Sequence, residues 1–145
     1  MKDIIELLKS EIKYFKKLKN AIGELHGHIH SLAVKTAHLY LKEKHPAVSS
    51  WEVSEKYGGG IDILGRNELG NEQVVAEVKT TSRSEKEQLG SQQKKKIVED
   101  IIKLSDSSAS NKYFFIIDNK NKTAIENLIK GHAQKKIQLV NIFEL

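Results

Sequence analysis

Apolar residues in the first third of the chain recur every three or four positions, which is typical of amphipathic α-helices. The first series, over residues 3–19, consists of Ile4, Leu7, Leu8, Ile12, Phe15 and Leu18, with lysines opposite. The second consists of Ile22, Leu25, Ile29, Leu32, Ala33, Thr36, Leu39 and Tyr40. It predicts another helix, or a bent continuation of the first. That helix should end near Lys44, because the residue before Pro46 is disfavoured in helical geometry.

From Ser49 the pattern changes to short alternating or continuous apolar runs, which are typical of strands. The predicted strands cover residues 49–55, 61–66, 72–80, 112–118 and 136–142. Asn and Gly residues between the second and third of these favour a hairpin turn. Helical spacing returns over residues 91–104 and 123–132. The order predicts an α/β fold, in which a strand meander and β-α-β crossovers form a mixed central sheet flanked by helices. We expect residues 1–145 to form a single domain.

Composition excludes several classes of protein. The 145 residues include no cysteine, so disulfides, thiolate metal sites and cysteine nucleophiles are excluded. No run of about 18 apolar residues occurs, and the N-terminus lacks the apolar stretch of a signal peptide. We therefore expect a cytoplasmic protein with no membrane partner. The net charge of +5 and lysine clusters within residues 13–19, 94–96 and 135–136 are compatible with a phosphate-rich partner.

The predicted hairpin brings charged residues together. Alternation places Glu77 and Lys79 on one face of the second strand, and a turn centred between Leu69 and Gly70 sets residue 62 opposite residue 77. Asp62, Glu77 and Lys79 then converge at one end of the hairpin. Such groups among apolar residues are costly unless they are paired or bind a ligand, and Mg²⁺ favours carboxylate and backbone oxygens. The alternative is an ordinary salt bridge on an exposed sheet face, the commoner origin of Glu-x-Lys.

Two segments extend this pattern, GGGIDILG at residues 58–65 and VVAEVKTT at residues 74–81. They combine a Gly-rich segment before the first strand, a strand in which an Asp lies between apolar residues, and Glu-x-Lys at the end of an apolar strand. A helix with an early glutamine and a buried strand follow. This combination resembles the core of the PD-(D/E)xK nuclease superfamily, the restriction-endonuclease-like fold. From Gly23 onward the chain fits its αβββαβ order, with an N-terminal helical extension, although Ile61 stands where the family often has proline.

The resemblance implies a Mg²⁺-dependent endonuclease that hydrolyses DNA phosphodiester bonds, with Mn²⁺ able to substitute. Asp62, Glu77 and the carbonyl of Val78 would bind the metal, and Lys79 would assist the attacking water.

Related nucleases also carry functional residues on the helices beside this core. A further acid often lies on the preceding helix, where Glu24 is the first candidate and Glu11 the second. A glutamine on the following helix often lies near the metal or the scissile phosphate, and Gln93 is preferred over Gln92. The lysines that follow it would hold the DNA backbone, namely Lys94, Lys95 and Lys96.

Several biological roles are compatible with this site. A type II restriction endonuclease, or its small catalytic subunit, is preferred over a Holliday junction resolvase or a DNA repair nuclease. A non-catalytic nucleic-acid-binding subunit with the same fold is the rival from another class. The amphipathic helix of residues 1–20 lies outside the minimal fold and could pack a homodimer or a larger partner subunit.

Three histidines form a competing motif. His26 and His30 lie one helical turn apart and could share a transition metal with His28 nearby, although no acid or cysteine completes the set by spacing. A role beside Glu24 and bound DNA, or an ordinary place in the core or in solvent, are the other interpretations.

Overall fold

A five-stranded mixed sheet forms the centre of the molecule. The computed structural model describes residues 2–54, 60–80 and 89–145. The strands lie in chain order, β1 (Ser50–Val53), β2 (Ile63–Arg66), β3 (Glu72–Lys79), β4 (Asn111–Ile116) and β5 (Gln138–Asn141). The first three pair antiparallel, whereas β3, β4 and β5 pair parallel. The predicted meander followed by crossovers is confirmed.

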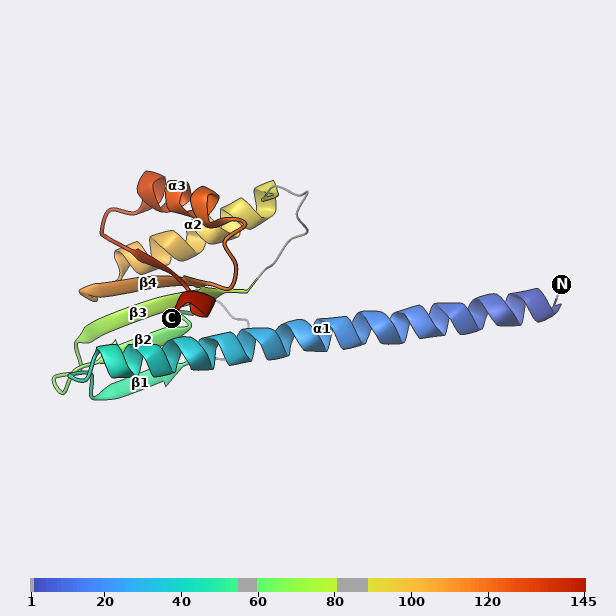
Figure 1. The fold of residues 1–145 in the computed structure, drawn as a ribbon, viewed down its shortest axis with the longest axis horizontal. Coiled ribbons are helices and arrows are strands. Elements are labelled where there is room, and N and C mark those ends of the chain that lie inside the picture. Colours follow the sequence, from blue (N-terminus) through green and yellow to red (C-terminus); the bar gives the residue numbers. More distant parts are fainter. Residues whose placement is uncertain (1, 55–59, 81–88) are drawn as a thin grey trace.

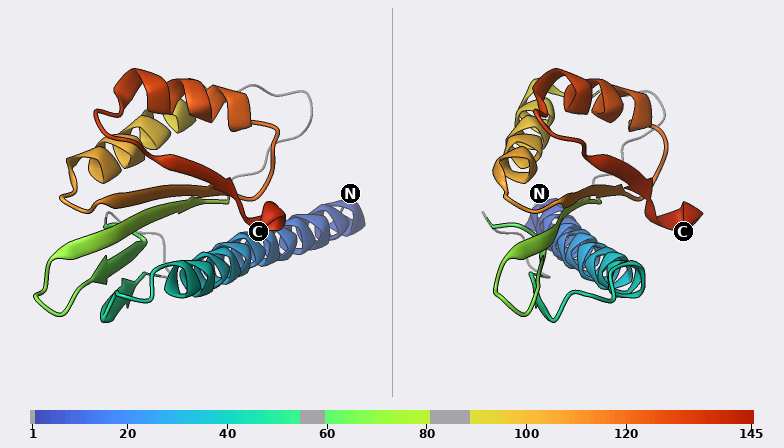
Figure 2. Two further views of the ribbon diagram at one scale, coloured as in Figure 1. Left: turned by 60° about the vertical axis from the view of Figure 1, so that its left-hand side comes forward. Right: turned by 90° about the vertical axis from the view of Figure 1, so that its left-hand side faces the viewer.

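Helices cover both faces of this sheet. Helix α1 (Lys2–Lys44) lies on one face, and α2 (Ser91–Asp106) and α3 (Lys122–His132) lie on the other (Figures 1 and 2). A 3₁₀ turn, η1 (Ile142–Glu144), follows β5. It was not predicted, and its first turn is capped by the side chain of Asn141, which accepts from the Phe143 amide. The α/β class and the mixed, helix-flanked sheet are therefore confirmed.

Helix α1 is a single continuous helix of 43 residues rather than two helices. Its C-terminal part packs on the sheet, and its N-terminal part projects beyond the body of the molecule (Figure 1). The buried stripe that meets the sheet consists of His30, Ala33, Val34, Ala37 and Leu41. Most of the large apolar residues that predict the helix stay exposed, so that series is not the packed face.

The β2–β3 hairpin has the turn chemistry that its sequence predicts. Gly70 has a φ of 80°, a left-handed conformation in which a side chain is strained. The Asn67 side chain accepts hydrogen bonds from the amides of Leu69 and Asn71. These contacts fix the turn, beside which Arg66 pairs with Glu72. The register then shifts by one residue between Gly65 and Arg66, and this irregularity sets the pairing of the rest of the hairpin.

The strand ends differ from the prediction at one informative point. β2 begins at Ile63, where pairing with Val53 starts, and not at Ile61. Ile61 lies before the strand, so the alternation of side chains along a strand does not apply to it. It packs with Leu64, on the face of the sheet opposite to Ile63. Residues 55, 58, 59 and 81, which belong to the predicted strand or to the motif segments, lie outside the described residues.

Candidate active site

The hairpin register brings Asp62 and Glu77 together. Ile63 pairs with Ala76 and Leu64 with Val75, so one further step sets residue 62 against residue 77, as predicted. Asp62 Oδ2 accepts a hydrogen bond of 2.8 Å from the Val78 amide. Both carboxyl residues are buried, Asp62 at 7% and Glu77 at 5% exposure. Two carboxylates therefore converge at the end of the hairpin.

The Glu77 carboxyl is strongly disfavoured in its charged form. The pKa of Glu77 is raised from 4.5 to about 9, and burial is the largest cause. The charges of Asp62 and Asp100 and a hydrogen bond with the Asp62 carboxyl act in the same direction, while a hydrogen bond from Lys103 acts in the opposite one. Without a cation, the Glu77 carboxyl therefore holds its proton at neutral pH.

Two residues of α2 that the sequence analysis missed complete the cluster. Lys103 Nζ donates to Glu77 Oε1 at 3.0 Å and to Asp100 Oδ1 at 3.2 Å. Lys79 Nζ donates to Asp100 Oδ2 at 3.0 Å. Burial lowers the pKa of Lys103, but its bonds and charge interactions with Glu77 and Asp100 leave that pKa raised overall. The carboxyl groups of Glu77 and Asp100 thus share two lysines.

A sequence signal for these two residues exists. Asp100 and Lys103 follow Gln93 at seven and ten positions, spacings that return to nearly the same side of a helix. They lie beside the apolar stripe of α2, which includes the buried residues Ile97, Ile101 and Leu104. Their place beside the apolar stripe marks both residues as candidates for a contact with the sheet, while their partners depend on how α2 crosses it.

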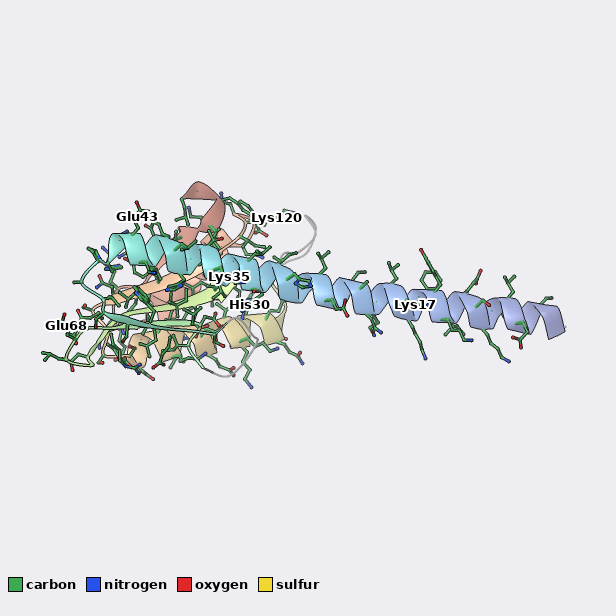
Figure 3. The ribbon with its side chains drawn as sticks, turned by 90° about the horizontal axis from the view of Figure 1, so that it is seen from below. Lys17, His30, Lys35, Glu43, Glu68 and Lys120 are labelled. Carbon is green, nitrogen blue, oxygen red and sulfur yellow. The ribbon has the colours of Figure 1, made fainter. Side chains whose placement is uncertain are left out.

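Helix α1 contributes a histidine to the cluster rather than the expected glutamate. His30 is 3% exposed, and its Nε2 lies 4.0 Å from Asp62 Oδ1. Glu24 is exposed and lies six residues earlier, about 9 Å along the helix axis. Glu11 lies still farther along the helix, and His26 and His28 are exposed. Figure 3 shows His30 where α1 enters the body of the molecule.

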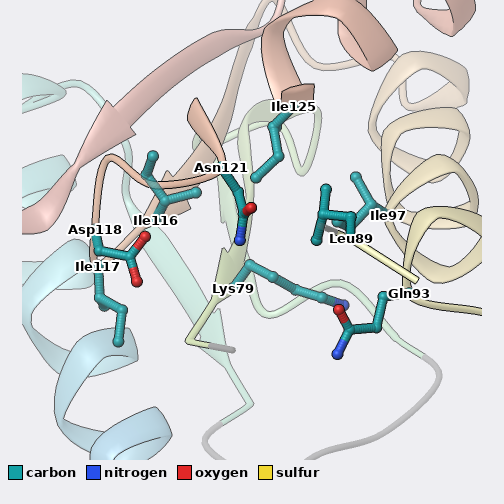
Figure 4. A pocket seen from close by; sticks show the side chains of 9 residues that line it. All are labelled: Lys79, Leu89, Gln93, Ile97, Ile116, Ile117, Asp118, Asn121 and Ile125. Carbon is teal, nitrogen blue, oxygen red and sulfur yellow. The ribbon is translucent and has the colours of Figure 1, made fainter. Parts of the chain in front are cut away.

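A pocket beside the cluster contains Lys79 and Gln93. It has a volume of about 370 Å³ and opens to solvent. Figure 4 shows both side chains pointing into it. Gln93 Oε1 is buried, with no hydrogen-bond partner among the described residues, whereas Gln92 is exposed. The preference for Gln93 over Gln92 agrees with this placement. The other lining residues are Leu89, Ile97, Ile116, Ile117, Asp118, Asn121 and Ile125.

The predicted DNA-contacting lysines lie at the start of α2. Lys94, Lys95 and Lys96 are all exposed. Helical spacing puts Lys96 on the same side as Gln93, Asp100 and Lys103, and turns the other two lysines away. The first turn of α2 has no acidic residue, and its N-cap residue Gly90 provides no side-chain cap, so the helix dipole favours an anion there.

The donor atoms at the hairpin end suit a hard divalent cation. Asp62 and Glu77 offer adjacent carboxylates, and the Val78 amide points toward Asp62. Because the N–H and C=O of one strand residue point to the same side, the Val78 carbonyl faces that side too. Carboxylates with a carbonyl are the ligands that Mg²⁺ uses. Within the described ranges, no group of three or more His, Asp or Glu side chains forms a metal site by side chains alone.

Comparisons of the chain with family models, curated proteins and solved structures find no match. The function is therefore inferred from the residues and geometry of this chain. None of the described helices has both the length and the apolar content that crossing a membrane requires.

Proposed function

We propose that this protein is a Mg²⁺-dependent endonuclease that hydrolyses DNA phosphodiester bonds with a restriction-endonuclease-like active site. One observation carries the proposal: Asp62, Glu77 and Lys79 lie together at one end of the β2–β3 hairpin. Asp62 is hydrogen-bonded to Glu77, while Glu77 and Lys79 are linked through Lys103 and Asp100. Two buried carboxyl groups in contact are costly to charge together in a metal-free fold, which is typical of a site that binds a cation.

Each side chain has a distinct role in this proposal. Asp62, Glu77 and the Val78 carbonyl would hold the metal, with Mn²⁺ able to replace Mg²⁺. When bound, the ion supplies Lewis acidity to the phosphoryl group and lowers the pKa of the attacking water. Lys79 orients that water and offsets negative charge that develops on the phosphoryl oxygens. Lys103 bonds to Glu77 and offsets the charge of Asp100 when no metal is present.

The surroundings of the cluster suit a DNA backbone. Gln93 projects into the pocket that Lys79 also lines, and its buried oxygen is available for a hydrogen bond. Lys96 and the amino end of α2 lie on the same side and offer positive charge to a phosphate. We assign Gln93 to positioning near the scissile phosphate and Lys96 to a contact with the DNA backbone. The predicted contacts of Lys94 and Lys95 are left out of this assignment, because helical spacing turns both residues to other sides of α2. Glu24 lies away from the cluster, and His30 is the α1 residue beside Asp62.

Within nuclease biology we prefer a type II restriction endonuclease or its small catalytic subunit, with a junction resolvase or repair nuclease as the alternative. Sequencing the ends of cleaved DNA separates these roles. Discrete ends at one short sequence support restriction, ends confined to branch points support a resolvase, and scattered ends oppose both.

A second candidate is a non-catalytic nucleic-acid-binding subunit with the same core. The bonds from Lys103 to Glu77 and Asp100 favour it, because they compensate part of the charge without a metal.

Incubation with supercoiled plasmid distinguishes the two candidates. We expect Mg²⁺-dependent nicking by the wild type, no nicking by Asp62→Ala, and a loss of about 10²–10³-fold in Lys79→Ala. Glu99→Ala, an exposed change on α2, is the matched control and should retain full activity. DNA binding without any metal-dependent nicking would support the non-catalytic subunit. Metal-dependent cleavage by Asp62→Ala would contradict the proposed active site.

A further inference from the structure

Helix α1 carries a continuous line of exposed apolar side chains, which we call the α1 seam. Its members recur alternately three and four residues apart, the heptad spacing of coiled coils. They are 39–66% exposed and comprise Ile4, Leu8, Phe15, Leu18, Ile22, Leu25, Ile29, Leu32 and Leu39. Two positions of the repeat are polar, Glu11 and Thr36. A seam of this length in water is typical of a helix that pairs with another helix.

The α1 seam continues along the flank of the helix after the helix meets the sheet. Helical geometry sets it about 100° around the axis from the stripe that packs on the sheet. Leu32 and Leu39 are 64% and 66% exposed, although Ala33 and Val34 beside them are buried. A second helix can therefore follow the whole seam without displacing the sheet.

We propose that the α1 seam binds the same seam of a second copy of this chain in an antiparallel, two-stranded coiled coil. This interface is independent of the proposed nuclease activity. In the register that we assign, Leu8, Phe15, Leu18 and Ile22 face Leu39, Leu32, Ile29 and Leu25 of the partner subunit, respectively. Each apolar position between residues 8 and 39 then meets an apolar position.

The two polar positions select this orientation. In the antiparallel register, Glu11 faces Thr36 of the partner subunit, whose hydroxyl can turn from its bond with the Leu32 carbonyl to the carboxylate. A parallel pair would instead set Glu11 against Glu11 of the partner subunit, which places two like charges in an apolar seam. The antiparallel register is centred between Gly23 and Glu24, the middle of a helix that runs from Lys2 to Lys44. Both helices therefore overlap along their whole length.

The area of the α1 seam is sufficient for a stable dimer. Covering its nine apolar side chains in both copies would remove roughly 1,500 Å² from water, and specific interfaces bury about 1,200–2,000 Å². The projecting half of α1 would then lie against the half of the partner helix that is fixed to a sheet. The lysines of residues 13–19 would lie near the level of His30 of the partner subunit, close to its acidic cluster.

Sedimentation equilibrium of the full chain tests the interface. We expect a mass twice the 16.4 kDa of one chain at micromolar concentration. Leu25→Lys should weaken the dimer at least about 100-fold, because it puts a charge at the centre of the α1 seam. Asn20→Lys adds the same charge to the opposite side of the helix and should leave the mass unchanged. A monomeric wild type, or a Leu25→Lys variant that stays dimeric, would overturn the proposal.

Disulfide trapping tests the orientation, because the chain has no cysteine of its own. Leu8→Cys and Leu39→Cys are both at exposed seam positions, and circular dichroism checks that each variant folds. A mixture of the two variants should give cross-linked heterodimers on oxidation, while either variant alone should not cross-link. Cross-linking of Leu8→Cys with itself would show parallel helices and contradict the antiparallel register.

Discussion

The two faces of β3 differ sharply in character. Toward α1 the strand presents Val74, Ala76 and Val78, which are buried among apolar residues. Toward α2 it presents Val75, then Glu77 and Lys79, and the two charged groups bond to residues of α2. One strand of eight residues thus contributes to an apolar core on both sides, and on the α2 side it also ends in a polar cluster.

The difference follows from the alternation of side chains along β3 and from the pocket beside the carboxyl end of this strand. Alternate side chains point to opposite faces, so a strand can be wholly apolar on one face without constraining the other. On the α2 side, the carboxyl end of β3 lies beside the solvent-open pocket, where charged groups can be paired and can reach a ligand. Both faces should therefore contribute to stability, whereas only the charged end of the α2 face should govern chemistry. The following predictions test that division.

Phe115→Ala should produce the largest loss of stability. Phe115 is fully buried on the α1 face of the sheet, in contact with the ring of Tyr40. Its removal leaves a cavity, and we expect a loss of about 3–5 kcal/mol in urea-induced unfolding. Plasmid nicking per folded molecule should be almost unchanged. Phe115→Leu is the milder control, and a loss of nicking without a loss of stability would contradict the division.

The charge of Glu77 should make stability fall as the pH rises. The pKa of Glu77 in the folded protein is about 9, against an ordinary value of 4.5, so between these values the folded state holds the extra proton. The contribution to stability is complete below about pH 4.5 and decreases toward pH 9, by about 1.4 kcal/mol per pH unit. As the pH rises from about 6 to about 8, the free energy of unfolding of Glu77→Gln should therefore increase by roughly 2–3 kcal/mol relative to wild type.

Unfolding in urea with EDTA present measures this effect. Glu99→Gln, at an exposed position of α2, is the matched control and should follow the wild-type pH profile. Added Mg²⁺ should flatten the wild-type profile and raise the melting temperature, because a bound cation favours the charged carboxylate. Identical pH profiles for wild type and Glu77→Gln would show that burial does not disfavour the Glu77 charge.

Lys112→Met should cost about 2 kcal/mol with no effect on nicking. Lys112 is 2% exposed, and its ammonium donates to the carbonyls of Leu104, Ser105 and Ser107 at the carboxyl end of α2. Its loss leaves these carbonyls without that donor. This buried lysine is structural and lies at the opposite end of α2 from Lys96. A large fall in nicking at full stability would show that polar groups at both ends of α2 serve the site.

Lys96→Ala should have the smallest effect, a loss of less than about 1 kcal/mol in DNA affinity. The slope of log K for DNA binding against log salt concentration should also decrease in magnitude by about one. Lys95→Ala is the matched control, because residue 95 lies on another side of the same helical turn. Equal effects of the two changes on binding would show that charge near α2, and not the position of Lys96, determines DNA contact.

The hairpin shows how much of the candidate site could be predicted. Strand alternation and a turn centred between Leu69 and Gly70 predicted Asp62 opposite Glu77. The structure has this pairing, but it reaches it through a register shift between Gly65 and Arg66 that the sequence pattern did not indicate. Asp100 and Lys103 could not be placed in the same way. Their pairing with Glu77 and Lys79 depends on how α2 crosses the sheet, which no local pattern specifies. Glu24 was selected by resemblance, and the course of α1 instead brings His30 to Asp62.

By itself the sequence determined the order of the helices and strands and the heptad spacing of α1, because these arise from residues close in the chain. Only the tertiary structure decided which face of α1 packs on the sheet. The small residues Ala33 and Ala37 allow close approach to the sheet, and the larger apolar residues Leu32 and Leu39 remain on the exposed flank. Contacts between residues far apart in the chain also brought the lysines and acids of β3 and α2 into one cluster.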